Sequence, residues 1–217
     1  MSKKIAVILA GCGVYDGSEI HESVLTLLRL SQQGVQVQCF APDIAQHHVI
    51  NHLTGEEMAE SRNVLVEAAR IARGNVRDVR ELLAADFDAL LIPGGFGVAK
   101  NLSDFAFKGD AAHVQPDVLA AAQSFAQASK PIGLICIAPA LAAAIYGNGV
   151  QCTIGIDPDV SGVLNRMGAE HVNCGVADIV VDSARKLVTT PAYMLANNIA
   201  EAAQGINTLV DEVLALV

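Results

Sequence analysis

The chain contains 217 residues, of which 52% are hydrophobic and only 4% aromatic, and its formal net charge at pH 7 is −9. Its 14 Lys and Arg residues are scattered along the sequence rather than clustered, so we expect no nucleic-acid partner. No apolar run approaches the roughly 20 residues that a membrane helix needs, so we expect no membrane span.

Composition also indicates the class of fold. The interior has to be filled by Ala, Val, Leu and Ile without a single Trp, which is typical of helices packed on a parallel sheet. Nothing in the composition marks a break, and we predict one domain over residues 1–217. The apolar run after Lys4 is stopped by Gly11 and is too short for a secretory leader, so we predict a cytoplasmic location.

The cysteine pattern favours reduced thiols. The five cysteines are odd in number and widely spaced, and they include no C-x-x-C pair; they are Cys12, Cys39, Cys136, Cys152 and Cys174. Neither a disulfide framework nor a zinc site is expected from such spacing. Cys12 lies near the end of the first predicted strand, and we interpret it as peripheral, like Cys39, Cys152 and Cys174.

Apolar runs of strand length alternate with segments whose apolar residues recur at helical spacing. The predicted strands are 5–10, 35–40, 88–92, the apolar run that Cys136 ends, 151–154, and a hairpin over 179–190, with a further short strand and turn within 76–83. The predicted helices are 20–30, 63–73, 116–128, 138–146, 157–167 and a long final helix from Tyr193 onward. This alternation predicts an α/β fold of the flavodoxin-like, doubly wound type, with a mostly parallel sheet and helices on both faces.

The turn after the first strand is rich in glycine and precedes the first helix. Ser18 is the expected N-cap of that helix, which places Glu22 in its first turn near the carboxyl end of the strand. A G-x-G pattern here is reminiscent of a dinucleotide fingerprint, but the third glycine is missing at its required place. We therefore expect no cofactor.

A polar segment without regular period covers residues 42–61 and contains His47, His48 and His52. Three histidines so close in sequence are compatible with a metal site, but we favour a solvated loop. We interpret the segment as an insertion over a functional site.

Cys136 ends a short apolar run just before an alanine-rich helical segment, so it is expected at a strand–turn–helix elbow. A thiol there projects from the end of the sheet, and the first N–H groups of the following helix favour a negative sulfur. Such a position suits a nucleophile. A small buried thiol at a strand end is the other interpretation, and the segment alone does not decide between them.

A second glycine-rich turn, Pro93-Gly94-Gly95-Phe96-Gly97, follows the strand 88–92. Glycines at the carboxyl end of a strand let backbone N–H groups approach a ligand and point at an oxyanion. Because the same edge of a parallel sheet should carry Cys136 and Glu22, we favour an oxyanion site over a simple tight turn.

With these segments in place, the chain resembles the PfpI-type superfamily, which has the class I glutamine amidotransferase fold. The elbow 135–139, the turn 93–97 and the acid in the first helix carry this resemblance. The segments 11–22, 51–56 and 189–194 are similar to the enhancing-lycopene-biosynthesis (ElbB) subfamily, and the likeness extends over nearly the whole length.

The resemblance implies a cofactor-independent glyoxalase, a lyase that converts glyoxal to glycolate, with a loose association with isoprenoid biosynthesis. It implies Cys136 as the nucleophile and Glu22 as the acid that shuttles a proton. It also implies Gly94, Gly95 and Ile137 as the oxyanion and substrate-binding donors. A homodimer is expected by analogy with relatives on this fold, and the substrate would be a small aldehyde.

The chain departs from the superfamily in its histidines. Amidotransferases carry a His near the chain end and PfpI-like members one about twenty residues beyond the cysteine, but neither position holds a histidine here. Glutamine hydrolysis is therefore not expected, and the glyoxalase should be slow. His113 and His171 are the candidate substitutes, although a surface role is favoured for both. Two alternatives stay open: a non-enzymatic, redox-responsive regulator or binding protein, and an amidotransferase-like partner subunit.

Overall fold

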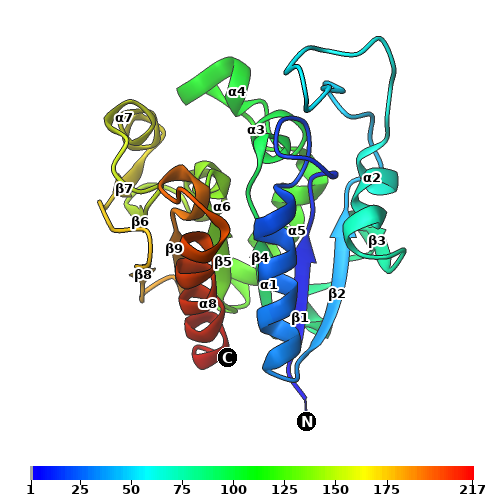
Figure 1. The fold of residues 1–217 in the computed structure, drawn as a ribbon. Helices are drawn as coiled ribbons and strands as arrows, with labels where there is room; N and C mark the ends of the chain where they lie inside the picture. The colour runs from blue at the N-terminus through cyan, green and yellow to red at the C-terminus, as the bar shows by residue number, and fades with distance from the viewer. Residues whose placement is uncertain (1) are drawn as a thin grey trace.

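The computed structural model describes residues 2–217, and its centre is a seven-stranded sheet with strand order β3-β2-β1-β4-β5-β9-β8 (Figure 1). All neighbouring pairs are parallel except β8 with β9. The strands are β1 (Lys4–Ile8), β2 (Gln36–Ala41), β3 (Val76–Asp78), β4 (Ala89–Ile92), β5 (Ile132–Ile135), β8 (Val180–Asp182) and β9 (Leu187–Thr190). A separate parallel pair consists of β6 (Val150–Cys152) and β7 (Ala169–His171).

Alternate residues of the central strands enter two apolar cores, one on each face of the sheet, because successive side chains of a strand point to opposite faces. On β1, Ile5 and Val7 belong to one core and Ala6 and Ile8 to the other, and all four are fully buried. The near-continuous apolar strands seen in the sequence are thus explained by burial on both sides.

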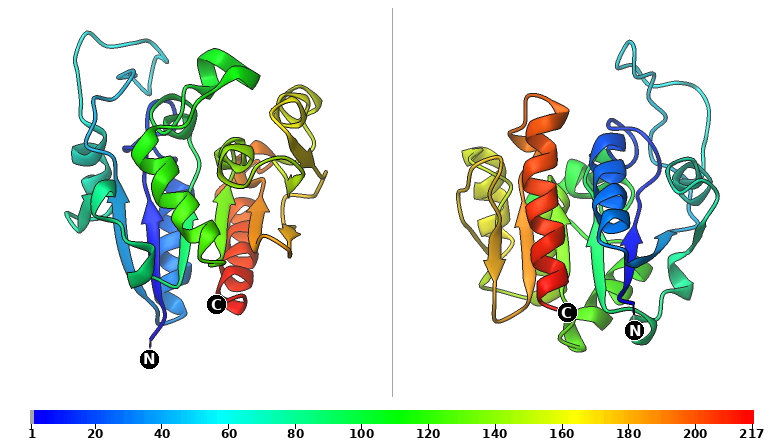
Figure 2. Two further views of the ribbon diagram at one scale, coloured as in Figure 1. Left: turned by 180° about the vertical axis from the view of Figure 1, so that it is seen from behind. Right: turned by 60° about the horizontal axis from the view of Figure 1, so that its bottom comes forward.

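Helices cover both faces of this sheet (Figure 2). The core that contains Ala6 and Ile8 packs against α5 and α6, and the core that contains Ile5 and Val7 packs against α1, α2 and α8. The helices are α1 (Ile20–Gln32), α2 (Val64–Ile71), α3 (Phe96–Lys100), α4 (Phe105–Lys108), α5 (Pro116–Gln127), α6 (Ala142–Tyr146), α7 (Pro158–Arg166) and α8 (Ile199–Ala215). The predicted doubly wound α/β fold is therefore confirmed.

Strand order reverses at β1, because the chain passes from β1 outward to β2 and β3 and then returns to the other side of β1 as β4. In such sheets a crevice opens beyond the carboxyl ends of the strands at this point. The turns after β1, β4, β5 and β9 all lie along this edge.

Residues 42–63 form a long loop that rises beyond the carboxyl end of β2 (Figure 1). Two isolated antiparallel bridges, Ala45 with Asn63 and Ile50 with Glu57, fold this loop back on itself. The N–H of Ile50 donates to Asp16 Oδ2 at 2.7 Å, which attaches the loop to the glycine-rich turn after β1. The predicted loop character of residues 42–61 is confirmed.

Some predicted boundaries were wrong, for local reasons. Glu19 rather than Ser18 caps α1, since the Glu19 carboxylate accepts the N–H of Glu22, whereas the Ser18 hydroxyl accepts the N–H of Ala10. The final helix begins at Ile199 rather than Tyr193, because the Asn198 side chain accepts two N–H groups of its first turn.

Two further differences concern the segment after Cys136 and the chain beyond α7. The predicted helix 138–146 is a 3₁₀ turn, Ala138–Leu141, followed by α6, and Pro139 stands in the first part of that turn. Strand β7 was missed because it is only three residues long and two of them, Glu170 and His171, are polar.

The long helix α8 offers a matched test of burial. Leu209 is fully buried against the sheet, whereas Ile199, the first residue of the helix, is 47% exposed. Leu209→Ala should lower the free energy of unfolding by about 2–5 kcal/mol, because it removes apolar contacts and leaves a cavity. Ile199→Ala should change it by less than about 0.5 kcal/mol. Denaturant unfolding of both variants measures this, and equal losses would contradict the placement of α8.

Candidate active site

Four chain segments converge at the carboxyl edge of the sheet around one thiol. Cys136 follows β5, Gly94 and Gly95 follow β4, Glu22 lies on α1 after β1, and Tyr193 follows β9. Residues far apart in the sequence are thus brought together by the parallel strand order.

Cys136 lies at the tip of a tight turn. Its φ of 62° is in the left-handed region, which an L side chain other than Asn or Asp rarely adopts. The Cys136 N–H donates to the Thr190 carbonyl at 2.9 Å, so the neighbouring strand holds the turn in place. A strained, well-supported backbone at an elbow is typical of a functional site and less so of a passive core thiol. The side chain is nearly buried, at 7% exposure.

Glu22 is a fully buried carboxyl group that faces this thiol. The Gly94 N–H donates to its Oε2 at 2.9 Å and the Tyr193 N–H to its Oε1 at 3.2 Å. The Cys136 thiol lies near enough to the same carboxyl group to affect its pKa. The two backbone donors fix the orientation of the Glu22 carboxyl group beside this thiol.

Burial, and secondly the nearby carboxylate of Glu19, raise the pKa of Glu22 from its usual 4.5 to about 8. The pKa of Cys136 is also raised well above its ordinary value, mainly by burial and then by the negative charge that Glu22 carries when ionised. Backbone N–H groups of Gly95 and Ile137 point at the sulfur and oppose this effect. At neutral pH Glu22 is therefore mostly protonated, and the neighbouring Cys136 is a thiol rather than a thiolate.

Gly94 and Gly95 allow neighbouring segments of the backbone to approach each other very closely. A Cβ on Gly94 would lie 2.4 Å from Cys136 Cβ and 2.7 Å from Glu22 Oε2. Gly95 has a φ of 99°, and a Cβ there would lie 2.3 Å from Glu19 N. The Gly94 N–H serves the carboxyl group of Glu22, whereas the N–H groups of Gly95 and Ile137 face the sulfur. Only the latter two are placed to serve an oxyanion that forms on a carbon bound to that sulfur.

A cavity of about 370 Å³ opens beside Cys136 and is mostly apolar. It is lined by the loop after β1, by α3, α4 and α7, and by the turns after β5 and β9; the lining residues are Val14, Glu19, Gly95, Phe96, Ala99, Phe105, Ala106, Cys136, Ile137, Val160, Tyr193 and Met194. No Lys, Arg or His of residues 2–217 is among them. None of residues 42–61 lines it either, so the loop flanks the site instead of covering it.

Sequence reasoning missed two polar side chains of this cavity. Glu19 is 8% exposed and lies one helical turn before Glu22, a spacing that could have indicated it. The Tyr193 hydroxyl lies 2.7 Å from His21 Nδ1. Burial, followed by the charges of Glu19 and Glu22, raises the pKa of Tyr193, so its hydroxyl keeps its proton.

The other candidate residues lie away from the thiol. His113 is exposed, 3.8 Å from Asp104, and His171 accepts the Ile154 N–H at 3.1 Å. Cys12 does not line the cavity, and burial raises its pKa. Lys100, just beyond the 93–97 turn, donates to the Tyr15 carbonyl at 3.0 Å and does not line the cavity.

The three histidines of the long loop are engaged with aromatic rings. His47 and His48 pack against Phe107, with ring centroids 4.2 and 5.7 Å away, and His52 packs on Tyr15 at 4.9 Å. Within residues 2–217 no group of three or more His, Cys, Asp or Glu side chains is arranged to hold a metal ion. In the same range no helix has the length and apolarity to span a bilayer.

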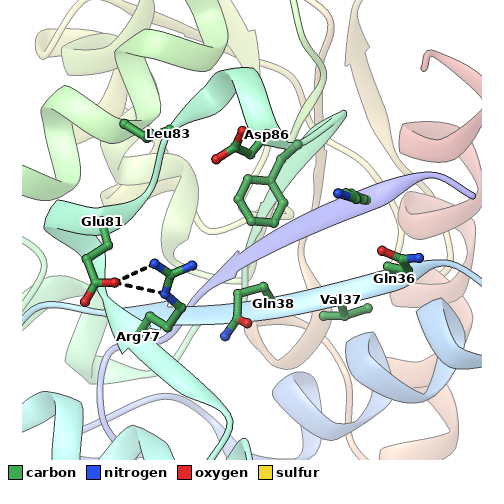
Figure 3. Close-up of a pocket in the computed structure, with 9 residues that line it drawn as sticks. Gln36, Val37, Gln38, Arg77, Glu81, Leu83 and Asp86 are labelled. Atoms are coloured by element: carbon green, nitrogen blue, oxygen red, sulfur yellow. Dashed lines mark hydrogen bonds and ion pairs between the residues drawn. The ribbon is translucent and has the colours of Figure 1, made fainter.

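A second hollow of about 360 Å³ lies at the amino ends of β1 and β2 and beside β3, far along the strands from Cys136 (Figure 3). Its wall includes Gln36, Gln38 and the ion pair of Arg77 with Glu81, whose Nη2 and Oε2 are 2.5 Å apart. Its lining residues within 2–217 include no thiol.

The fold and this site together define a protein with the glutamine amidotransferase-like class 1 fold and a cysteine at a strand–helix elbow. The model of the DJ-1/PfpI family matches residues 3–201, and the chain belongs to this family.

Three similar proteins illustrate the relationship. A human protein named glutamine amidotransferase-like class 1 domain-containing protein 3, mitochondrial, is 46% identical over 223 residues, covering 98% of this chain and 83% of that protein. A structure from Ehrlichia chaffeensis, described as an isoprenoid biosynthesis protein with amidotransferase-like domain, superposes with a TM-score of 0.93 at 40% identity, covering 99% of both chains.

More distantly, glyoxalase III from Candida albicans shares the fold, with a TM-score of 0.60 at 14% identity over 99% of this chain and 97% of that one. Because the human relative is named as mitochondrial, the predicted cytoplasmic location finds no support in it.

The raised pKa of Glu22 predicts how stability depends on pH. Between about pH 4.5 and 8 the folded state holds a proton that an unfolded glutamate releases, so stability falls as pH rises through this window, by up to about 1.4 kcal/mol per pH unit. Glu22→Gln removes this titration. The free energy of unfolding of the variant, measured in denaturant at pH 5 to 8, should therefore fall less steeply than that of the wild type. The exposed Glu56→Gln should keep the wild-type slope, and an unchanged slope in Glu22→Gln would refute the buried proton.

Proposed function

We propose that the protein is a cofactor-independent glyoxalase that converts glyoxal to glycolate, with Cys136 as the nucleophile and Glu22 as the acid and base. Such an enzyme is a lyase of small aldehydes. The pairing of an elbow thiol with a fully buried, proton-holding carboxyl group carries this proposal.

The residues present suit an aldehyde. Adding a thiol to an aldehyde expels no leaving group, so no imidazole is required to protonate one, and no histidine of residues 2–217 lines the cavity. The work left for the protein is to move one proton between two adjacent carbons. A carboxyl group with a pKa of about 8 suits that task because its proton affinity is matched to neutral pH.

The proposed steps balance with water as the only co-reactant. The ionised form of Glu22, which a pKa of about 8 leaves accessible at neutral pH, takes the thiol proton while the sulfur of Cys136 bonds to one aldehyde carbon. The new alkoxide is stabilised by the N–H groups of Gly95 and Ile137 and receives that proton from Glu22, which gives the hemithioacetal. Glu22, ionised again, removes the C–H proton of this carbon and delivers it to the neighbouring carbon, while the hydroxyl proton passes to the neighbouring oxygen, so the product is a glycolyl thioester. Water attacks the thioester, the C–S bond breaks, and glycolate leaves.

We further propose membership of the enhancing-lycopene-biosynthesis subfamily, a single domain over residues 1–217 and a homodimer. The Ehrlichia chaffeensis protein is described as an isoprenoid biosynthesis protein, which supports a connection to that pathway, in agreement with the motifs 11–22, 51–56 and 189–194. Whether the connection is metabolic or regulatory is a separate question from the reaction.

The alternative, a redox-responsive regulator, requires a thiolate that reacts readily with oxidants. Burial and the ionised form of Glu22 both raise the pKa of Cys136, which disfavours that role in the resting protein.

Replacing the thiol tests the proposal directly. Cys136→Ser should abolish glyoxal consumption and glycolate formation by purified protein without added cofactor or metal, because a hydroxyl is a far weaker nucleophile. Cys174→Ser removes a thiol outside the cavity and should leave the rate unchanged. Turnover in the wild type that survives in Cys136→Ser would show that another group is the nucleophile.

Replacing the carboxyl group tests the second role. Glu22→Gln keeps the size of the side chain but cannot transfer a proton, and kcat should fall by about 10²–10⁴-fold. Steady-state kinetics with glyoxal measures it. A rate within a few fold of the wild type would remove Glu22 from the mechanism.

A further inference from the structure

The cavity beside Cys136 is much larger than the proposed substrate needs. Glyoxal has two carbons and two oxygens, whereas about 370 Å³ falls in the range of about 300–1,000 Å³ that is usual for larger organic ligands. The extra space is lined by apolar side chains, among them Phe105, Val160 and Met194. An apolar space of this size next to a nucleophile suits a hydrocarbon group attached to the reacting carbon.

The polar part of the same site has the geometry of acyl transfer. A thiol with an acid–base partner faces two backbone N–H groups, from Gly95 and Ile137, which point at the sulfur. An oxyanion that forms on a carbon bonded to this sulfur would lie near both donors. Tetrahedral intermediates of esters and thioesters carry such an oxyanion.

From these two observations we propose that the site also hydrolyses activated acyl compounds, namely aryl esters or thioesters of uncharged, medium-length apolar acids, with the acyl chain in the cavity. This activity depends on the same nucleophile as the proposed glyoxalase but not on glyoxal chemistry, so either activity can fail alone.

The steps balance without an oxidant, reductant or cofactor. The ionised form of Glu22 accepts the thiol proton and the sulfur of Cys136 bonds to the acyl carbon, which converts its C=O into an oxyanion at the N–H groups of Gly95 and Ile137. The oxyanion collapses, the bond to the leaving oxygen or sulfur breaks, and the released anion takes the proton from Glu22. Water then gives a proton to Glu22 and adds to the acyl carbon, the C–S bond breaks, and the sulfur regains that proton. The sum is ester plus water to acid plus phenol or thiol.

The charged groups of the site determine which substrates it excludes. Glu19 is the charged side chain that lines the cavity beside the Cys136–Glu22 pair, and no Lys, Arg or His of residues 2–217 is there. An acyl chain that ends in a carboxylate would be placed near Glu19 and Glu22 without a cation, and would lose its hydration. Amides are expected to react far more slowly for another reason, because aryloxides and thiolates leave as anions, whereas an amine has to be protonated before its bond to the acyl carbon breaks.

The test compares 4-nitrophenyl acetate, 4-nitrophenyl hexanoate and the mono-4-nitrophenyl ester of adipic acid, whose six-carbon acyl group ends in a carboxylate. We expect kcat/KM for the hexanoate ester to be at least tenfold higher than kcat/KM for the acetate ester. It should also be at least tenfold higher than kcat/KM for the adipate ester. Intact-protein mass spectrometry after rapid quenching should show a hexanoyl group on Cys136, and Cys136→Ser should lose both the adduct and turnover.

Two substitutions test whether the acyl chain of the substrate lies in the cavity. Val160→Phe narrows the cavity and should lower the ratio of hexanoate to acetate kcat/KM at least fivefold, whereas Phe105→Ala should shift the preference toward octanoate. Val66→Phe makes the same change as Val160→Phe at a 62% exposed position of α2 and should leave the ratio unchanged.

Each outcome separates the two proposals. A chain-length preference lost in Val160→Phe supports acyl binding in the cavity whether or not glyoxal is consumed. Glyoxal turnover without a Cys136 acyl adduct, equal rates for all three esters, or a ratio that Val160→Phe leaves unaltered would overturn the acyl proposal and leave the glyoxalase standing. Ester turnover without glyoxal consumption would overturn the glyoxalase alone.

Discussion

The contact between Glu22 and Cys136 is the interaction on which the rest of the site depends. A carboxyl group without water costs several kcal/mol if it is ionised and unpaired, so its burial requires either a proton or hydrogen-bond donors. The chain supplies both. The N–H groups of Gly94 and Tyr193 reach Glu22 from the ends of two different strands, and neither group belongs to the helix that carries Glu22. Those donors orient the carboxyl group but do not cancel its desolvation, which is why its pKa stays raised.

This contact also explains the glycines around it. Gly94 has to lie against the Cβ of Cys136 and the carboxylate of Glu22 at once, and any side chain there would occupy the space of one or the other. Gly95 follows with a positive φ, which turns its N–H toward the sulfur. The left-handed Cys136 completes the arrangement, because only a sharp turn can present both its side chain and the N–H of Ile137 to the same point. Such backbone conformations persist only where the surrounding structure enforces them, and here the bond from Cys136 N–H to Thr190 on β9 does so.

Much of the fold could be predicted from the sequence because its strands are continuous apolar runs and its helices have clear periods. The convergence of Cys136, Glu22 and the 93–97 turn also followed from a general rule, since carboxyl ends of parallel strands share an edge. The predicted starts of α1 and α8 were wrong because a single side chain, Glu19 or Asn198, caps the helix, and the sequence pattern did not identify which neighbouring residue would do so. Tyr193 was missed as a site residue because its role comes from a backbone N–H, which every residue except proline has, and from a contact with His21 across 172 positions of sequence. The shape and apolar lining of the cavity arise from six separate segments, and no local pattern encodes them.

Within residues 2–217, no histidine lines the cavity, and a buried acid lies beside the thiol. Both features restrict which group can transfer a proton in this site. A nucleophilic cysteine paired with an imidazole can carry out amide hydrolysis, because the imidazole first takes the thiol proton and then gives it to the amine. Here the group that touches the thiol and holds a proton at neutral pH is Glu22, fixed from both sides by backbone donors. It can exchange a proton with the sulfur and with groups that lie close to the sulfur. The site therefore favours reactions in which the proton moves only between the sulfur, the carbon bonded to it and its nearest neighbours. Additions to aldehydes and transfers from good leaving groups meet that condition. The apolar lining of the cavity then determines which of these substrates bind beside Cys136.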